Sequence, residues 1–256
     1  MNVPIISPSY MRAGATLTQG AFHDVIFAVH EFEADAYRDA GDGDVWVLPD
    51  ELRGNLSKVR NYIQDHANDE FDCEEFIVCC DDISHIGWFE GNQPHKMTKD
   101  QVDEFIEMGF ILARDIDVKM WGMNCKGCDK GSYREYTPFS CKSYISATFG
   151  GFRRLDLRYD ERLPLKEDYD MCLQILNKYR RLLRINYAFY VSKLHTNKGG
   201  CASIRTMERE RQQLDLLQAK WGKKIVQTDS GASSVQRQKK AAFDFNPILK
   251  CPIGGV

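Results

Sequence analysis

Residues 76–82 read Phe76-Ile77-Val78-Cys79-Cys80-Asp81-Asp82, an apolar run that ends on two acids. A short apolar run of this length is typical of a strand buried on both faces. Open α/β sheets bind ligands beyond the carboxyl ends of their strands, and paired carboxylates are hard oxygen ligands that suit Mg²⁺ or Mn²⁺. The stretch therefore predicts a metal and diphosphate site. A solvated turn after a strand is the alternative.

Apolar runs and helical periodicity alternate around this stretch. Further strands are predicted at Val3–Ile6, Val25–Val29 and Val45–Leu48. Between the last of these and residue 76, four apolar residues share one helical face and predict a crossover helix: Leu52, Leu56, Val59 and Ile63. This order predicts an α/β fold with a mostly parallel central sheet flanked by helices. We expect one Rossmann-like domain over residues 1–225 and a partly flexible C-terminal extension over residues 226–256, which is polar at its start.

Three later segments carry local signals. Thr98 and Gln101 form a capping-box pattern at the start of an amphipathic helix. A second helix is expected to begin near Lys166, after Pro164, and a strand at Tyr187–Val191 follows it. A sparse apolar stripe predicts a surface helix from Thr206 to Trp221.

The composition excludes several protein classes. The 34 Lys and Arg nearly balance the 37 Asp and Glu, so no general field draws the chain to nucleic acid or membranes. The sequence contains neither a signal-peptide pattern nor a long apolar span. Its nine scattered cysteines fit reduced thiols, so we expect a cytoplasmic protein. It lacks a P-loop and a G-x-G-x-x-G motif, so a diphosphate site would depend on a metal.

Two further groups of residues could carry chemistry. Glu167, Asp168 and Asp170 lie at an expected helix start, where a carboxylate can be held rigidly as a general base. Acids in a first helical turn are also favoured by the helix dipole alone. His195 precedes a loop with Lys198 and Gly199, so it could add a metal ligand beside a phosphate-binding loop, or be a polar surface residue.

Cys125 and Cys128 have the spacing of half a zinc site, with Cys141 as a third candidate ligand. The sequence offers no second Cys-x-x-Cys pair and no paired histidines close by. Structural zinc is therefore the less favoured interpretation, and the sequence leaves it open.

Taken in order, these landmarks resemble the GT-A glycosyltransferases, and most of all the TET-associated glycosyltransferase group of phage and related genomes. The resemblance covers roughly residues 3 to 222 and includes the turn at 7–12, the helix at 54–61, the strand at 76–83 and the Glu-Asp motif at 166–170. It implies transfer of a sugar from a nucleotide-sugar donor. It also implies a donor site formed by Ser7, Pro8, Tyr10, Arg12, Arg60, Asn61, Asp81, Lys198 and Gly199.

The resemblance also implies roles for the acids. Asp82 and His195 would bind Mn²⁺ or Mg²⁺, while Asp81 lies nearer the ribose, because Cys80 replaces the first acid of the usual Asp-x-Asp motif. Asp168 would be the base of an inverting enzyme, with Glu167 orienting it or binding acceptor. Inversion and retention both remain open at this stage. So do the sugar and the nucleotide of the donor, although uridine diphosphate is the commonest expectation.

The TET-associated group is thought to modify hydroxymethyl-pyrimidines of DNA, such as 5-hydroxymethylcytosine, and such a base must leave the helical stack. This implies DNA as a partner, with Trp88, Trp121, Arg153 and Asp170 as acceptor-binding residues. Other cations that could contact phosphates are Arg154, Arg158, Arg180, Arg181 and Arg184, together with Arg237, Lys239 and Lys240 near the C-terminus. Tryptophans are usually core residues, and cations are common at helix ends. A glycan or metabolite acceptor, a sugar nucleotidyltransferase and a non-enzymatic binding module are the alternatives. The oligomeric state is open.

Overall fold

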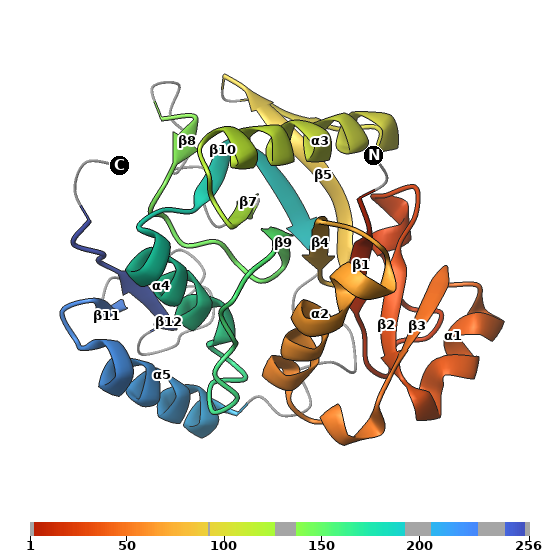
Figure 1. The fold of residues 1–256 in the computed structure, drawn as a ribbon, viewed down its shortest axis with the longest axis horizontal. Coiled ribbons are helices and arrows are strands. Elements are labelled where there is room, and N and C mark those ends of the chain that lie inside the picture. Colours follow the sequence, from red (N-terminus) through yellow and green to blue (C-terminus); the bar gives the residue numbers. More distant parts are fainter. Residues whose placement is uncertain (1–2, 92, 126–136, 193–205, 230–243, 254–256) are drawn as a thin grey trace.

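A computed structural model describes residues 3–91, 93–125, 137–192, 206–229 and 244–253. It shows an α/β fold in which helices cover both faces of a mixed, largely parallel sheet (Figure 1). The strands are β1 Ile5–Pro8, β2 Ile26–His30, β3 Asp44–Leu48, β4 Glu75–Cys79, β5 Ile83–Glu90, β6 Gln93–Lys96, β7 Met120–Cys125, β8 Phe139–Ser140, β9 Phe149–Arg153, β10 Leu183–Ser192, β11 Val226–Asp229 and β12 Asp244–Leu249. The helices are α1 Ala34–Ala40, α2 Leu56–Glu70, α3 Lys99–Asp115, α4 Glu167–Tyr179 and α5 Met207–Trp221, with short 3-10 turns at Thr18–Gly20, Glu31–Glu33 and Asp50–Leu52.

The main sheet has the order β3-β2-β1-β4-β9-β7-β10-β5-β6, and β8 pairs with β10. Strands β1 to β4 run parallel to one another, and β7 and β10 run in the same direction. Antiparallel β9 begins opposite the end of β4, where Phe149 pairs with Cys79. Antiparallel β5 begins opposite the end of β10, where Ile83 pairs with Ser192. The ends of β1, β4 and β10 and the starts of β5 and β9 therefore meet at one edge.

The two faces of the sheet are covered by different helices. Ile5 and Ile77 belong to a cluster with α1 and α3, whereas their neighbours Ile6 and Val78 belong to a cluster with α2 and α4. Alternate residues of a strand point to opposite faces, so β1 and β4 are buried on both sides. This explains why the apolar residues of both strands are consecutive rather than alternating, as in Ile5-Ile6 and in Phe76 to Cys79.

A third cluster joins α4 to α5 and to the β11–β12 pair (Figure 1). Leu173 of α4 packs there with Leu214 and Leu217 of α5, and Val226 closes the cluster. Strand β12 pairs antiparallel with β11. The boundary between residues 225 and 226 stays a prediction, but the described part of the extension packs against the domain.

The predictions for the fold are confirmed where the sequence pattern is strong. The four predicted N-terminal strands are present, with β1 beginning slightly later than expected, and Thr98 forms the capping box with Gln101. Helices α2, α4 and α5 also form where they were expected. Strand β9 was not predicted, because its Gly150 and Gly151 weaken a strand pattern. No described helix has the length and apolar content needed to cross a bilayer.

The core beneath α3 depends on two glycines. The indole of Trp121 is fully buried and meets Phe105, Phe110 and Phe149 edge to face. A Cβ at Gly109 of α3 would lie 2.4 Å from the indole, and a Cβ at Gly151 of β9 would lie 2.1 Å from its nitrogen. Glycine is therefore needed at both positions, because a ring this enclosed cannot move aside.

We predict that Gly109→Ala destabilises the protein by about 1–3 kcal/mol because the new methyl overpacks against Trp121. The sign is informative, since alanine in a helix interior normally stabilises by up to about 1 kcal/mol over glycine. Urea unfolding followed by circular dichroism measures the change. Glu107→Ala on the exposed side of α3 is the control, and equal stability of the two variants would contradict the packing argument.

Candidate active site

The turn after β4 presents Asp81 toward the end of β1. Its carboxylate accepts hydrogen bonds from the Ser9 hydroxyl and from the Arg12 guanidinium. Ser9 is also hydrogen-bonded to the Tyr37 hydroxyl at 2.7 Å. Burial raises the pKa of Asp81, and the Arg12 charge and the Ser9 hydrogen bond oppose that rise. The side chain of Asp81 is thus held against the turn that follows β1.

Asp82 points to the other side of the turn, toward β10. Its Oδ1 accepts a hydrogen bond of 2.6 Å from Ser192 Oγ, at the last residue of that strand, and its side chain is buried. A carboxylate held at a strand end is a suitable oxygen ligand for Mg²⁺ or Mn²⁺, with phosphate oxygens and water as the remaining ligands. The described residues include no cluster of three His, Cys, Asp or Glu that could hold a metal ion. His195 lies outside the described residues.

Thr18 fixes the shape of the turn between Asp81 and Asp82. Its hydroxyl donates to the carbonyl of Cys80 at 2.7 Å and accepts from the amide of Ile83 at 3.2 Å. A single side chain therefore bridges both ends of the turn. This role of Thr18 could not be predicted from the sequence, because Thr18 is far from residues 80–83 along the chain.

Residues 144–148 connect the strand end with the start of α4. The amide of Cys80 donates to the carbonyl of Thr148 at 2.9 Å, and Arg60 donates to the carbonyl of Ala147 at 3.0 Å. The amide of Ala147 donates to Asp168 Oδ2 at 3.2 Å. The structure thus brings the Cys80–Asp82 turn, Arg60 of α2 and Asp168 of α4 around one short segment.

The carboxylate of Asp168 is held by three donors. Oδ2 accepts from the hydroxyl of Tyr144 as well as from Ala147, and Oδ1 accepts from the amide of Tyr169 at 2.8 Å. The ring of Tyr144 stacks on that of Tyr169 at 4.1 Å, so the donor itself is fixed. Asp168 is only half-buried. It is a rigid carboxylate within reach of solvent, which is what a general base requires.

Glu167 is buried beside Arg60 and cannot act in the same way. Its Oε1 lies 3.7 Å from Arg60 Nε, and both side chains are almost fully enclosed. Burial, reinforced by the neighbouring Asp168, raises the pKa of Glu167 to about 8, while Arg60 opposes the rise. The two adjacent acids of α4 therefore differ in surroundings, one oriented at the surface and one enclosed.

Comparison of the chain with models of known protein families identifies its family. The model of the TET-associated glycosyltransferase family matches residues 3–200. The chain belongs to the TET-associated glycosyltransferase family. The resemblance inferred from the sequence motifs is thereby confirmed. No curated protein matches the chain.

The solved structures similar to this glycosyltransferase are distant. S. aureus TarS 1–349 superposes with a TM-score of 0.46 at 12% identity, covering 94% of this chain and 78% of that one. A CMP:2-keto-3-deoxy-manno-octonic acid synthetase complexed with CTP gives a TM-score of 0.45 at 10% identity, covering 86% of this chain and 100% of the other.

Most donor-site candidates of this TET-associated glycosyltransferase lie at the shared sheet edge. Ser7 and Pro8 end β1, and Tyr10 meets His30 and Phe32 edge to face at 5.9 and 6.0 Å. Phe32, which the sequence interpretation missed, is 49% exposed. Asn61 instead braces the chain before α4, because its amide pairs with the backbone of Tyr159 at 3.0 and 2.8 Å. Lys198 and Gly199 lie outside the described residues.

The four acceptor-site candidates do not gather in the same place. Trp121 is enclosed in the core, and Asp170 is fully buried with hydrogen bonds to α5. Arg153 pairs with Glu75 and donates to backbone carbonyls beneath α3, and Trp88 stacks on His95 further along β5. As placed, Trp121 and Asp170 offer no surface for an acceptor. The zinc candidates Cys125 and Cys128 have no described side chains.

We predict that Glu167→Gln flattens the pH dependence of stability. Because the pKa of Glu167 is raised from 4.5 in the unfolded chain to about 8, the folded state binds the extra proton and stability falls as pH rises through that window. The wild-type protein should therefore lose roughly 1–3 kcal/mol more than the variant between pH 5 and pH 8. Urea unfolding at the two pH values measures this. Glu104→Gln, on the exposed face of α3, should behave as wild type, and parallel curves for all three proteins would contradict the assignment.

Proposed function

We propose that this protein is a metal-dependent glycosyltransferase that moves a sugar from a nucleotide-sugar, with UDP as the expected nucleotide, to the hydroxymethyl group of a modified pyrimidine in DNA. Membership of the family supports the reaction class. The observation that carries the mechanism is the rigid, solvent-reachable carboxylate of Asp168. It is linked through Ala147 and its neighbour Thr148 to the strand end with Asp81 and Asp82.

Asp168 serves as the general base in this proposal. The acceptor hydroxyl attacks the anomeric carbon of the donor sugar, the bond from that carbon to the phosphate oxygen breaks, and Asp168 takes the hydroxyl proton. The nucleoside diphosphate leaves with the bonding electron pair. A single displacement of this kind inverts the anomeric configuration. Tyr144 and Ala147 keep the base in place, so its orientation costs little at the moment of reaction.

The β1 turn supplies the nucleotide site. Asp81 and Arg12 are fixed to each other beside Ser9, and Tyr10 and Phe32 expose aromatic surface beside them that can stack on a base. Asp82, with Ser192 behind it, would hold the divalent cation. That cation, when bound, would neutralise charge on the departing diphosphate.

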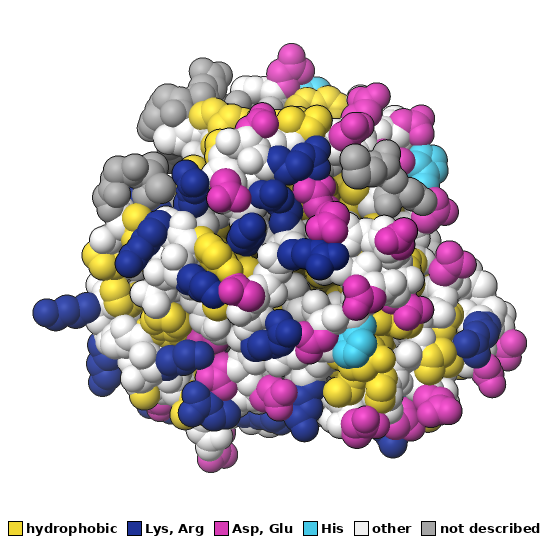
Figure 2. Space-filling view, viewed as in Figure 1, with side chains coloured by type: hydrophobic (Ala, Val, Ile, Leu, Met, Phe, Trp, Pro, Cys, Tyr) yellow, Lys and Arg dark blue, Asp and Glu magenta, His cyan; other side chains and the backbone are white. Residues whose placement is uncertain are grey.

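DNA as the acceptor is supported by the family and by the distribution of charge. The face of the molecule in Figure 2 carries Lys and Arg over its centre and over the side with α4 and α5, whereas Asp and Glu gather toward the end with α1. A polyanion can therefore approach α4, whose first turn holds Asp168, despite the net charge of −3.

We predict that Asp168→Asn retains donor binding but lowers the rate of transfer by roughly 100-fold or more, since it removes the base. Asp82→Asn should instead weaken metal-dependent donor binding. Calorimetry with UDP and Mn²⁺, and transfer rates for each variant, separate the two effects. Asp35→Asn, on the exposed surface of α1, is the control. The site assignment is wrong if all three variants bind and transfer as wild type does.

The reaction itself is tested by incubating hydroxymethylated DNA with the protein, Mn²⁺ and a panel of nucleotide-sugars. Mass spectrometry of the released nucleosides should show a gain of one pentose or hexose, and NMR of the product should show an inverted anomeric centre. Hydrolysis of one donor without any mass gain on DNA would retain the glycosyltransferase and remove DNA as its acceptor.

A further inference from the structure

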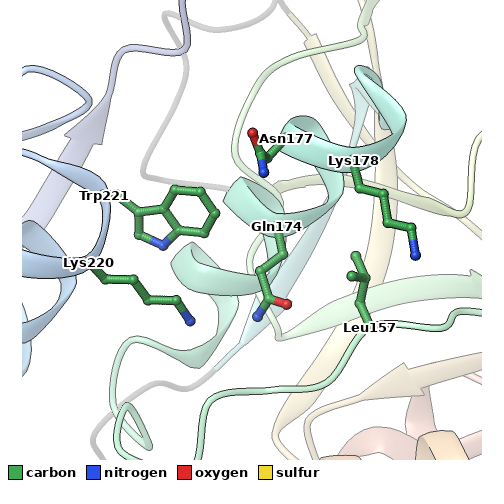
Figure 3. A pocket seen from close by; sticks show the side chains of 6 residues that line it. All are labelled: Leu157, Gln174, Asn177, Lys178, Lys220 and Trp221. Carbon is green, nitrogen blue, oxygen red and sulfur yellow. The ribbon is translucent and has the colours of Figure 1, made fainter.

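A surface hollow of about 400 Å³ lies between α4 and α5, away from the sheet edge that holds Asp81 and Asp82. It is lined by Leu157, Gln174, Asn177, Lys178, Lys220 and Trp221 (Figure 3). Trp221 and Lys220 enter it from one side, Lys178 and Leu157 border the other, and the amides of Gln174 and Asn177 lie between them. No role in donor binding or in the transfer step falls to these side chains.

The indole of Trp221 is held in a fixed position at this hollow. Its Nε1 donates to Asp170 Oδ1 at 2.7 Å, and Asp170 is fully buried. Lys220 also binds Asp170, at 2.9 Å, and its ammonium lies 5.8 Å from the indole ring. The ring is therefore pre-oriented, and a planar ligand that stacks on it would not have to order it.

The chain around the hollow is basic. Residues 177–184 and 220–224 contain Lys178, Arg180, Arg181, Arg184, Lys220, Lys223 and Lys224 and no acid. Asp156 binds Lys178, and Asp160 binds Lys220 at 3.0 Å. With Asp170, which also binds Lys220, three acids stand against the seven cations of these segments. The excess of cations agrees with the concentration of Lys and Arg on this side of the molecule (Figure 2).

We propose that this hollow binds the nucleic-acid strand beside the acceptor nucleotide, with one base stacked on Trp221 and the neighbouring phosphates on Lys178 and the cations around it. Stacking on an aromatic ring combined with phosphate contacts is how single strands are held without sequence preference. This subsite rests on the proposed function, because it explains how a DNA acceptor is positioned.

The distance along α4 fits a strand that reaches both sites. Asp168 lies in the first turn of α4 and Lys178 in the last, which separates them by about 15 Å at 1.5 Å per residue. At the rise of about 3.4 Å per nucleotide of a stacked duplex strand, this corresponds to roughly four nucleotides, and to fewer in an extended single strand. A mononucleotide bound at Asp168 would therefore not reach Lys178, whereas a short oligonucleotide would.

The first test compares Lys178→Glu with Lys96→Glu, a matched charge reversal on the exposed surface of β6. Fluorescence anisotropy of a labelled single-stranded 12-mer with one 5-hydroxymethylcytosine measures binding as salt is varied. We expect Lys178→Glu to weaken binding roughly five- to tenfold and to lower the salt slope by about one, with little change for Lys96→Glu. Transfer to 5-hydroxymethyl-dCMP should be unchanged in both variants.

The second test isolates stacking. Trp221→Phe and Trp221→Leu both lose the hydrogen bond to Asp170, but only phenylalanine keeps an aromatic face, so the leucine variant should bind the 12-mer at least about fivefold more weakly. Equal binding by these two variants, or equal loss in Lys178→Glu and Lys96→Glu, overturns the proposal. Saturable displacement of the 12-mer by a neutral oligosaccharide would do the same, since it assigns the hollow to a glycan.

These readouts also separate the subsite from the reaction. Transfer to the mononucleotide together with insensitive 12-mer binding would retain the proposed function and remove the subsite. Binding that depends on Lys178 and on the Trp221 ring, without transfer to any hydroxymethyl acceptor, would support the subsite and refute the proposed acceptor.

Discussion

The buried guanidinium of Arg60 is the constraint on which the site depends. It projects from α2, donates to the carbonyl of Ala147 and pairs with Glu167 at the start of α4. Burying this cation without partners would cost roughly several kcal/mol of desolvation free energy. The folded protein must therefore place these partners beside it. These two partners lie in parts of the chain that are far from α2 in the sequence. One side chain therefore fixes the distance between the strand end after β4 and the helix that carries Asp168.

Neighbouring acids in this site differ because their surroundings differ. Asp81 is held by Arg12 and Ser9, whereas Asp82 turns toward Ser192, so the two residues face opposite strands across one turn. Adjacent residues after a strand point in different directions, and the same holds in the first turn of a helix, where side chains are about 100° apart. Asp81 and Asp82 are therefore held in different positions although they are the same type of residue.

The sequence predicted what is local and missed what is not. The strand before Asp81 is a continuous apolar run, and the helix that carries Asp168 has apolar residues at helical spacing, so both were predicted from short windows. The holding groups, Thr18 and Tyr144, carry no signal, because each contacts residues far along the chain. Trp121 shows the converse. It was expected to bind the acceptor, but its ring is enclosed by the core, against two glycines that come from α3 and β9. Enclosure of this kind depends on tertiary packing.

Helix α5 lies beyond the residues that match the family, yet α4 depends on it. Lys166, at the N-terminal end of α4, is fully buried and pairs with Glu210 of α5 at 2.5 Å. Asp170, one turn later, is bound by Lys220 and Trp221. A buried ammonium or carboxylate must keep its partner, so α5 fixes the turn of α4 on which Asp168 lies. The orientation of Asp168 is therefore determined both by the residues that match the family and by the segment that follows them.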